Sequence, residues 1–67
     1  MTYTLNINFI QSDIEDYNFN NITEWEKELI LKQYMAWNII TVTDHDDDGT
    51  IYYINPKNIV SLYFDEE

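Results

Sequence analysis

The stretch TYTLNINFI, residues 2–10, alternates polar and apolar side chains from Thr2 to Phe9. Successive side chains of a β-strand point to opposite faces, so this period of two is typical of a strand that is buried on one face. The apolar face carries Tyr3, Leu5, Ile7 and Phe9, and the polar face carries Thr2, Thr4, Asn6 and Asn8. The sequence therefore predicts an N-terminal strand that lies against a hydrophobic core.

A helix is predicted further along, with its N-cap at Thr23. Glu26 stands at the position that completes a capping box with Thr23, and acidic residues in the first turn favour the positive end of a helix. Trp25 and Leu29 are spaced by one helical turn, as are Ile30 and Tyr34, which gives the helix an apolar face that could cover a sheet. The segment before the helix, residues 11–21, is rich in Asn, Asp and Ser, and we expect an ordered loop or a short helical turn there.

The remainder of the chain is predicted to form strands, after a change from helix to strand within residues 35–38. Runs of β-branched and aromatic residues favour extended structure, and Asp, Asn, Gly and Pro favour turns. Strands are predicted at residues 39–43, 50–54 and 59–64, separated by turns at residues 44–49 and 55–58. The result is an α+β domain spanning residues 1–67, with one helix packed on an antiparallel sheet of about four strands in the chain order β-α-β-β-β, the last three forming a meander.

The composition excludes several classes of protein. The chain has 67 residues, of which 45% are hydrophobic, so it is too apolar for a disordered acidic tail. It has no cysteine, which excludes a disulfide scaffold and thiolate zinc sites and favours a reducing compartment. The N-terminus lacks the basic and apolar regions of a signal peptide, and no apolar run reaches membrane-spanning length. We therefore expect a cytoplasmic protein without a cofactor.

The net charge is the most unusual property of the sequence. Thirteen acidic residues stand against three lysines (Lys27, Lys32 and Lys57) and no arginine, which gives a formal charge of −10. The field of such a molecule repels phosphate groups, so neither a nucleic acid nor a membrane surface is expected as a direct partner. Asn, Ile and Tyr, whose codons are A/T-rich, are abundant, and this favours a low-GC bacterium or its phage as the source.

The carboxylates fall into four groups: in the loop, at the helix start, in a turn and at the C-terminus. Carboxylates displayed on one face can imitate the phosphate rows of a duplex and occupy the basic groove of a nucleic-acid enzyme, although a charged run is more commonly a solvated face. Tyr52 is added as an aromatic contact because its neighbour Tyr53 points to the other face of the strand. The predicted partner-binding residues are Asp13, Glu15, Asp16, Glu24, Glu28, Asp44, Asp46, Asp47, Asp48, Tyr52, Asp65 and Glu66.

Residues 44–49 also match the first half of a calcium loop. Asp44, Asp46 and Asp48, followed by Gly49, give the pattern D-x-D-x-D-G, in which alternate carboxylates converge on a hard cation. The second half does not match, because Asn55 stands where the bidentate acid belongs. The alternative is an acidic hairpin turn without metal, which we favour.

Catalytic machinery is not apparent in the sequence. His45, the one histidine, lacks a Ser or Cys placed to act with it and is predicted to be an exposed turn residue. With one glycine and no arginine, the chain offers neither a phosphate-binding loop nor an obvious oxyanion site. We therefore expect a protein that is not an enzyme.

Residues 40–44 (ITVTD) and 48–53 (DGTIYY) form a strand, an acidic turn and an aromatic strand. This segment is similar to the first hairpin of the small phage inhibitors of uracil-DNA glycosylase. The resemblance implies an inhibitor of a DNA glycosylase as one class of function. The predicted helix stands before the hairpin here, which departs from the pattern of that family.

Three functional hypotheses follow from the sequence. The first is a non-enzymatic inhibitor of phage or mobile-element type that binds the basic surface of a host nucleic-acid-handling protein, of the anti-restriction, anti-CRISPR or DNA-glycosylase inhibitor class. The second is a structural or regulatory module that acts as a homodimer or other oligomer, or by strand addition through residues 3–9 or 59–64 as an edge strand. The third is a weak calcium-binding domain that uses Asp44, Asp46 and Asp48.

Overall fold

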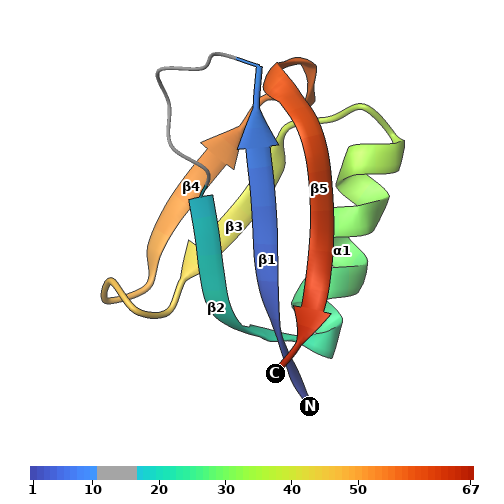
Figure 1. The fold of residues 1–67 in the computed structure, drawn as a ribbon. Coiled ribbons are helices and arrows are strands. Elements are labelled where there is room, and N and C mark those ends of the chain that lie inside the picture. Colours follow the sequence, from blue (N-terminus) through green and yellow to red (C-terminus); the bar gives the residue numbers. More distant parts are fainter. Residues whose placement is uncertain (11–16) are drawn as a thin grey trace.

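The strand predicted from the opening alternation is the centre of a three-stranded antiparallel sheet. The structure, a computed structural model, describes residues 1–10 and 17–67. In it β1 (Thr2–Phe9) lies between β2 (Tyr17–Thr23) and β5 (Ile59–Glu66), so the strand order is β2-β1-β5 (Figure 1). Leu5 and Ile7 are fully buried, as their places in the alternation predict. Because β1 is central, its expected role as an edge strand is wrong, whereas β5 does form an edge.

Strand β2 includes residues 17–21 of the segment predicted to be a loop or a short helical turn, and that prediction is wrong for those residues, whereas residues 11–16 lie outside the described part of the chain. Phe19 and Ile22 are buried and hold the strand against the core. The register with β1 shifts between them, and Asn21 adopts a φ of 60°, which is the left-handed conformation that Asn tolerates. This bulge places the two apolar residues three apart, so the period of two that marks a strand is absent from the sequence.

Helix α1 (Glu24–Met35) begins as predicted. The Thr23 Oγ1 accepts from the Glu26 amide at 3.2 Å, and the Glu26 Oε1 accepts from the Thr23 amide at 3.1 Å, which completes the capping box. The helix ends at Met35, inside the predicted range. The pair of Ile30 and Tyr34 packs as expected, with Ile30 buried and Tyr34 against the core, whereas Trp25 is 71% exposed and does not belong to the packing face.

Strands β3 (Ile40–Asp44) and β4 (Thr50–Ile54) form the predicted antiparallel hairpin as a separate two-stranded sheet. The expected three-strand meander is wrong, because the last strand pairs with β1 and not with β4. The 3₁₀ turn η1 (Pro56–Asn58), with Pro56 buried, carries the chain across to the first sheet. The α+β class with one helix packed on antiparallel sheets is confirmed.

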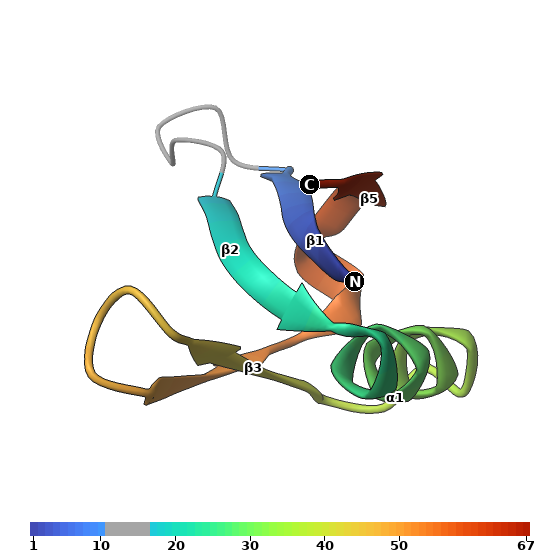
Figure 2. The same cartoon turned by 90° about the horizontal axis from the view of Figure 1, so that it is seen from below.

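The core lies between two layers. The hairpin and α1 lie side by side and cover one face of the three-stranded sheet (Figure 2). The buried residues are Leu5, Ile7, Phe19, Ile22, Ile30, Ile40, Val42, Ile54 and Ile59. The chain ends lie together, since the Glu67 amide donates to the Thr2 carbonyl at 3.0 Å. Within residues 1–10 and 17–67, no helix has the length and apolar character needed to cross a membrane.

Candidate functional site

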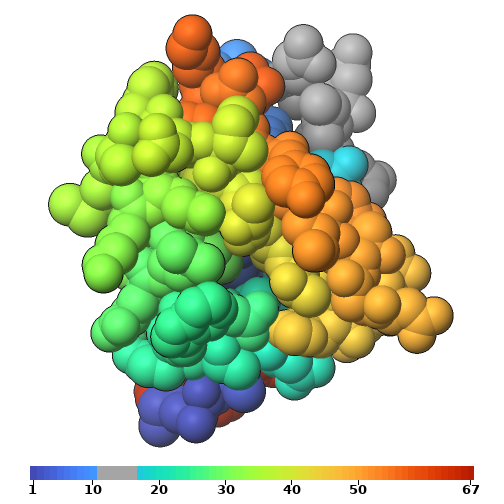
Figure 3. Space-filling model, turned by 180° about the vertical axis from the view of Figure 1, so that it is seen from behind, coloured from blue at the N-terminus to red at the C-terminus, as the bar shows by residue number. Residues whose placement is uncertain are grey.

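Acidic side chains from three separate parts of the chain meet at one end of the molecule. They come from the start of α1 (residues 24–28), the last residue of β3 with the turn that follows it (residues 44–49) and the end of β5 with the C-terminal residue (residues 65–67). Figure 1 shows the start of α1 and the end of β5 at the end that carries both termini, with the β3–β4 turn projecting to one side in the same half of the molecule, and Figure 3 shows from behind that the helix start and the chain termini reach the same end. We call this surface the acidic end.

The bulge in β2 holds two of these segments in place. The Asn20 Nδ2 donates to the Asp46 Oδ2 at 3.0 Å, which attaches the β3–β4 turn to β2. The Asn21 amide donates to the Glu67 Oε1 at 2.8 Å, which attaches the C-terminus to the same bulge. Within the turn, the Asp46 amide donates to the Asp44 Oδ1 at 3.1 Å. The feature that conceals β2 in the sequence is therefore the feature that assembles the acidic end.

His45 connects the turn to the helix. Its Nε2 lies 3.0 Å from the Glu26 Oε2, and its side chain is 37% exposed, so the predicted exposure is accompanied by a specific partner. Partial burial acts to raise the pKa of Glu26, but hydrogen bonds from the Thr23 amide, His45 and the Thr23 hydroxyl, together with the charge of His45, lower it below the ordinary value of 4.5. Glu26 therefore remains a carboxylate that joins the capping box to the turn.

Tyr3 is where the helix and the C-terminal strand meet. A hydrogen bond to the Glu24 side chain, followed by desolvation and by the charges of Glu24 and Glu66, raises the pKa of Tyr3 to about 12. The Lys27 Nζ lies 4.4 Å from the centroid of the Tyr3 ring, in cation–π geometry. One of the three lysines thus lies against this end of the molecule and offsets part of its negative charge.

The remaining predicted residues of the acidic end are distributed over its surface. Glu28, Asp47 and Asp48 are exposed, and Asp48 has a φ of 53° in the tight turn that ends at Gly49. Asp65 accepts a hydrogen bond from the Asn6 Nδ2 at 3.0 Å. The other predicted carboxylates, Asp13, Glu15 and Asp16, lie outside the described residues.

The calcium-loop hypothesis gains no ligand set from this geometry. The two carboxylate oxygens of Asp46 accept hydrogen bonds from the side-chain amides of Asn20 and Asn21, and Asp44 accepts one from the backbone of the turn. In the described part of the chain, no group of three or more His, Cys, Asp or Glu side chains is arranged to hold a metal ion.

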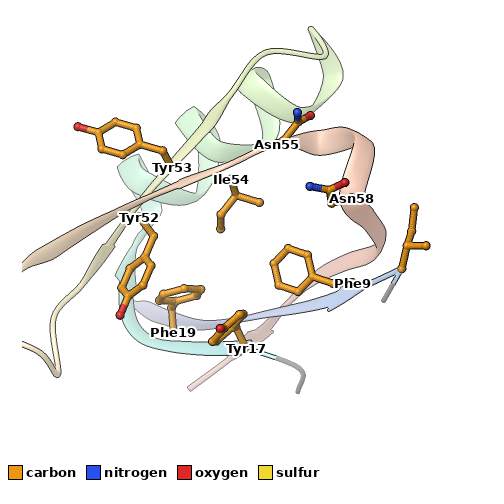
Figure 4. A pocket seen from close by; sticks show the side chains of 9 residues that line it. Phe9, Tyr17, Phe19, Tyr52, Tyr53, Ile54, Asn55 and Asn58 are labelled. Atoms are coloured by element: carbon orange, nitrogen blue, oxygen red, sulfur yellow. The ribbon is translucent and has the colours of Figure 1, made fainter. Parts of the chain in front are cut away.

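Tyr52 lies away from the acidic end. Its ring contacts Phe19 edge-on at a centroid distance of 5.5 Å, in the wall of an aromatic cavity near the far end of β4, while Tyr53 is 72% exposed. The cavity has a volume of about 360 Å³ (Figure 4). It was not predicted, although the sequence signal is visible as aromatic residues on both sides of residues 11–16. Its walls are made by Phe9, Ile10, Tyr17, Phe19, Tyr52, Tyr53, Ile54, Asn55 and Asn58.

Comparison with known proteins adds no assignment: no family model, curated protein or solved structure matches the chain. A functional assignment therefore depends on the geometry and charge of these two surfaces.

Proposed function

We propose that the chain is a non-enzymatic interaction protein that binds the basic surface of a nucleic-acid-handling protein through its acidic end. Such a partner is a nuclease, glycosylase, polymerase or effector complex, and binding would block the groove that receives nucleic acid. This is the behaviour of an inhibitor of phage or mobile-element type. Carboxylates arranged on a folded surface attract a basic groove through the same electrostatic steering that draws in DNA.

The observation that carries the proposal is the convergence of the acidic groups. Residues 24–28, 44–49 and 65–67 are distant in sequence, yet hydrogen bonds from Asn20 and Asn21 and the pair of His45 with Glu26 join them. Holding like charges together costs stability through mutual repulsion. A fold that supplies specific bonds to hold them is consistent with a surface that is used in binding.

The distribution of the lysines supports the same conclusion. Lys27 lies over Tyr3, but Lys32 is in the last turn of α1 and Lys57 is in η1, away from the first helical turn and the β3–β4 turn. The negative field at the acidic end is therefore only partly offset. A positively charged groove on a partner would supply the missing countercharge.

The proposal is tested by competition with DNA. The protein is immobilised, nucleic-acid-binding proteins of a low-GC bacterial lysate are passed over it, and each retained protein is purified and tested for displacement by duplex DNA. A retained nucleic-acid-binding protein that DNA displaces, and whose activity on DNA falls when the free chain is added, is the expected result. Retained proteins that bind DNA and this chain simultaneously would contradict the proposal.

A second function is favoured by the exposed edge of the three-stranded sheet. Strand β5 forms this edge and carries exposed Val60 and Tyr63. An edge strand offers unpaired backbone groups to another strand, so a homodimer or a strand-addition complex is the second candidate. Size-exclusion chromatography with light scattering measures the mass of the protein in solution. A strictly monomeric mass at high concentration would exclude the homodimer and leave strand addition to a partner as the form of this second function.

A further inference from the structure

The aromatic cavity lies between the three-stranded sheet and β4. Phe9, Tyr17 and Phe19 project from the sheet, and Tyr52 and Ile54 project from β4 towards them (Figure 4). The rings hold one another in edge contacts, with centroid distances of 5.5 Å for Phe9 and Tyr17 and 5.5 Å for Phe19 and Tyr52. Such contacts fix ring positions before any ligand arrives.

The size of the cavity limits what it can accept. A volume of about 360 Å³ is near the lower end of the range of roughly 300–1,000 Å³ that is usual for ligand pockets. A space of this size admits one side chain or a small molecule and not a folded segment. The lining combines aromatic faces with the carboxamide of Asn58, which lies above the Phe9 ring in Figure 4.

Charge complementarity identifies the class of occupant. Aromatic faces carry negative electrostatic potential and attract cations, and the molecule as a whole carries a charge of −10. Lys57 stands in η1 between the lining residues Asn55 and Asn58, so the ring faces and the overall charge, and not a carboxylate in the lining, are what favour a cation here. A guanidinium group is weakly hydrated, stacks on aromatic rings and donates to amide oxygens such as that of Asn58. A lysine ammonium group is more strongly hydrated and loses more on entering an apolar cavity.

We infer that the cavity binds the guanidinium group of an arginine side chain on the partner protein. Strand β4 leads from the acidic turn to the end of the molecule at which β1 ends (Figure 1), so a basic partner segment along β4 would reach both. The cavity then gives the interface a preference for arginine that carboxylates alone do not provide. This inference rests on the proposed function, because it assigns one part of the same interface.

The test uses a blocked, unstructured peptide of alternating glycine and arginine as the probe. Two comparison peptides carry citrulline, the neutral isostere of arginine, or lysine at the same positions. Binding is followed by NMR shifts of the aromatic resonances of the full chain. The arginine peptide is expected to shift the resonances of Phe9, Tyr17 and Tyr52, and to bind roughly fivefold more tightly than the lysine peptide, with still weaker binding of the citrulline peptide.

Variants show where the peptide binds. Tyr17→Leu keeps an apolar side chain at an exposed position and removes one ring face, so it should reduce arginine binding by roughly threefold or more. Tyr63→Leu makes the same change at an exposed position on β5, outside the cavity lining, and should leave binding unchanged. If the citrulline peptide binds as tightly as the arginine peptide, or if Tyr17→Leu has no more effect than Tyr63→Leu, the cavity is not an arginine site.

The outcome for the cavity is separable from the outcome for the acidic end. If the arginine peptide shifts only the NMR resonances of residues 44–49, and Tyr17→Leu does not change its binding, the cavity inference is overturned while the proposed function stays in place. If the arginine peptide shifts the resonances of the cavity residues, but no protein retained from the lysate is displaced by DNA, arginine binding is supported and the proposed function is contradicted.

Discussion

At the scale of single residues, Tyr3 reports on the carboxylates around it. Glu24→Gln removes the charge of the side chain that hydrogen-bonds Tyr3, so the pKa of Tyr3 should fall from about 12 towards its ordinary value of 10.0. A raised pKa stabilises the fold below pH 10, and this contribution is lost as the pH rises to about 12. An NMR titration of the Tyr3 ring measures the change. Glu28→Gln, on the same helix, is the control, and an unchanged Tyr3 pKa in Glu24→Gln would contradict the assignment.

Glu26 gives a second prediction, at the opposite end of the pH scale. Its side chain is 16% exposed and serves both the capping box and His45, so Glu26→Gln should lower the free energy of unfolding at neutral pH by about 1 kcal/mol. The pKa of Glu26 is lowered, so its contribution is complete above pH 4.5 and is lost as the pH falls further.

Urea denaturation of wild type and Glu26→Gln at several pH values measures this difference. The two curves should converge in acid. Glu28→Gln changes one carboxylate outside the capping box, and its effect should stay within about 0.5 kcal/mol. A difference between wild type and Glu26→Gln that is constant from neutral pH to acid would show that the ionised carboxylate is not what stabilises the helix start.

At the scale of elements, β2 is the strand that its sequence conceals. Ile22 is fully buried, so Ile22→Ala should lower the free energy of unfolding by about 2–4 kcal/mol. Ile51 on β4 is 52% exposed, and Ile51→Ala, the same chemical change, should cost no more than about 0.5 kcal/mol. Equilibrium denaturation of both variants decides the matter. Equal, small losses would mean that residues 17–23 are not part of the core.

The elements that could be predicted are those with a complete local signal. Alternation reveals β1, the capping box of Thr23 and Glu26 reveals the start of α1, and β-branched residues reveal β3. Strand β2 could not be predicted, because the bulge at Asn21 breaks its period of two. The pairing of β5 with β1 could not be predicted either, since it joins opposite ends of the chain and no local pattern records it.

The candidate site also has a part that could be predicted from local sequence and a part that could not. Composition and clustering indicate which carboxylates are exposed to solvent. Asp47, Asp48 and Glu66 are examples, because charged residues in a turn or near a chain end are exposed whatever the fold. The contacts that assemble them, such as Asn20 with Asp46, join residues that are 26 positions apart and are visible only in the fold. The aromatic cavity has the same origin, since its rings come from β1, β2 and β4.

At the scale of the whole molecule, the charge of −10 acts on a distant partner as one field, to which the carboxylates of the acidic end contribute. Long-range steering raises association rates and is screened by salt, because the Debye length falls from about 30 Å at 0.01 M to about 8 Å at physiological ionic strength. The arrangement of acidic residues, and not the net charge alone, should therefore control association with a basic partner.

The direct test is the association rate of the purified, DNA-displaceable partner, measured by stopped flow against salt concentration for two variants of equal charge. One carries Asp47→Asn, Asp48→Asn and Glu66→Gln at the acidic end, where Asn suits the φ of 53° at Asp48. The other carries Met35→Lys, Ile39→Lys and Val60→Lys, which change the net charge by the same amount at exposed positions at the end of α1, after it and at the start of β5. The wild-type rate should fall steeply with salt, and the acidic-end variant should associate more slowly, and with a weaker salt dependence, than the second variant. A rate indifferent to salt, or equal losses in both variants, would contradict binding through the acidic end.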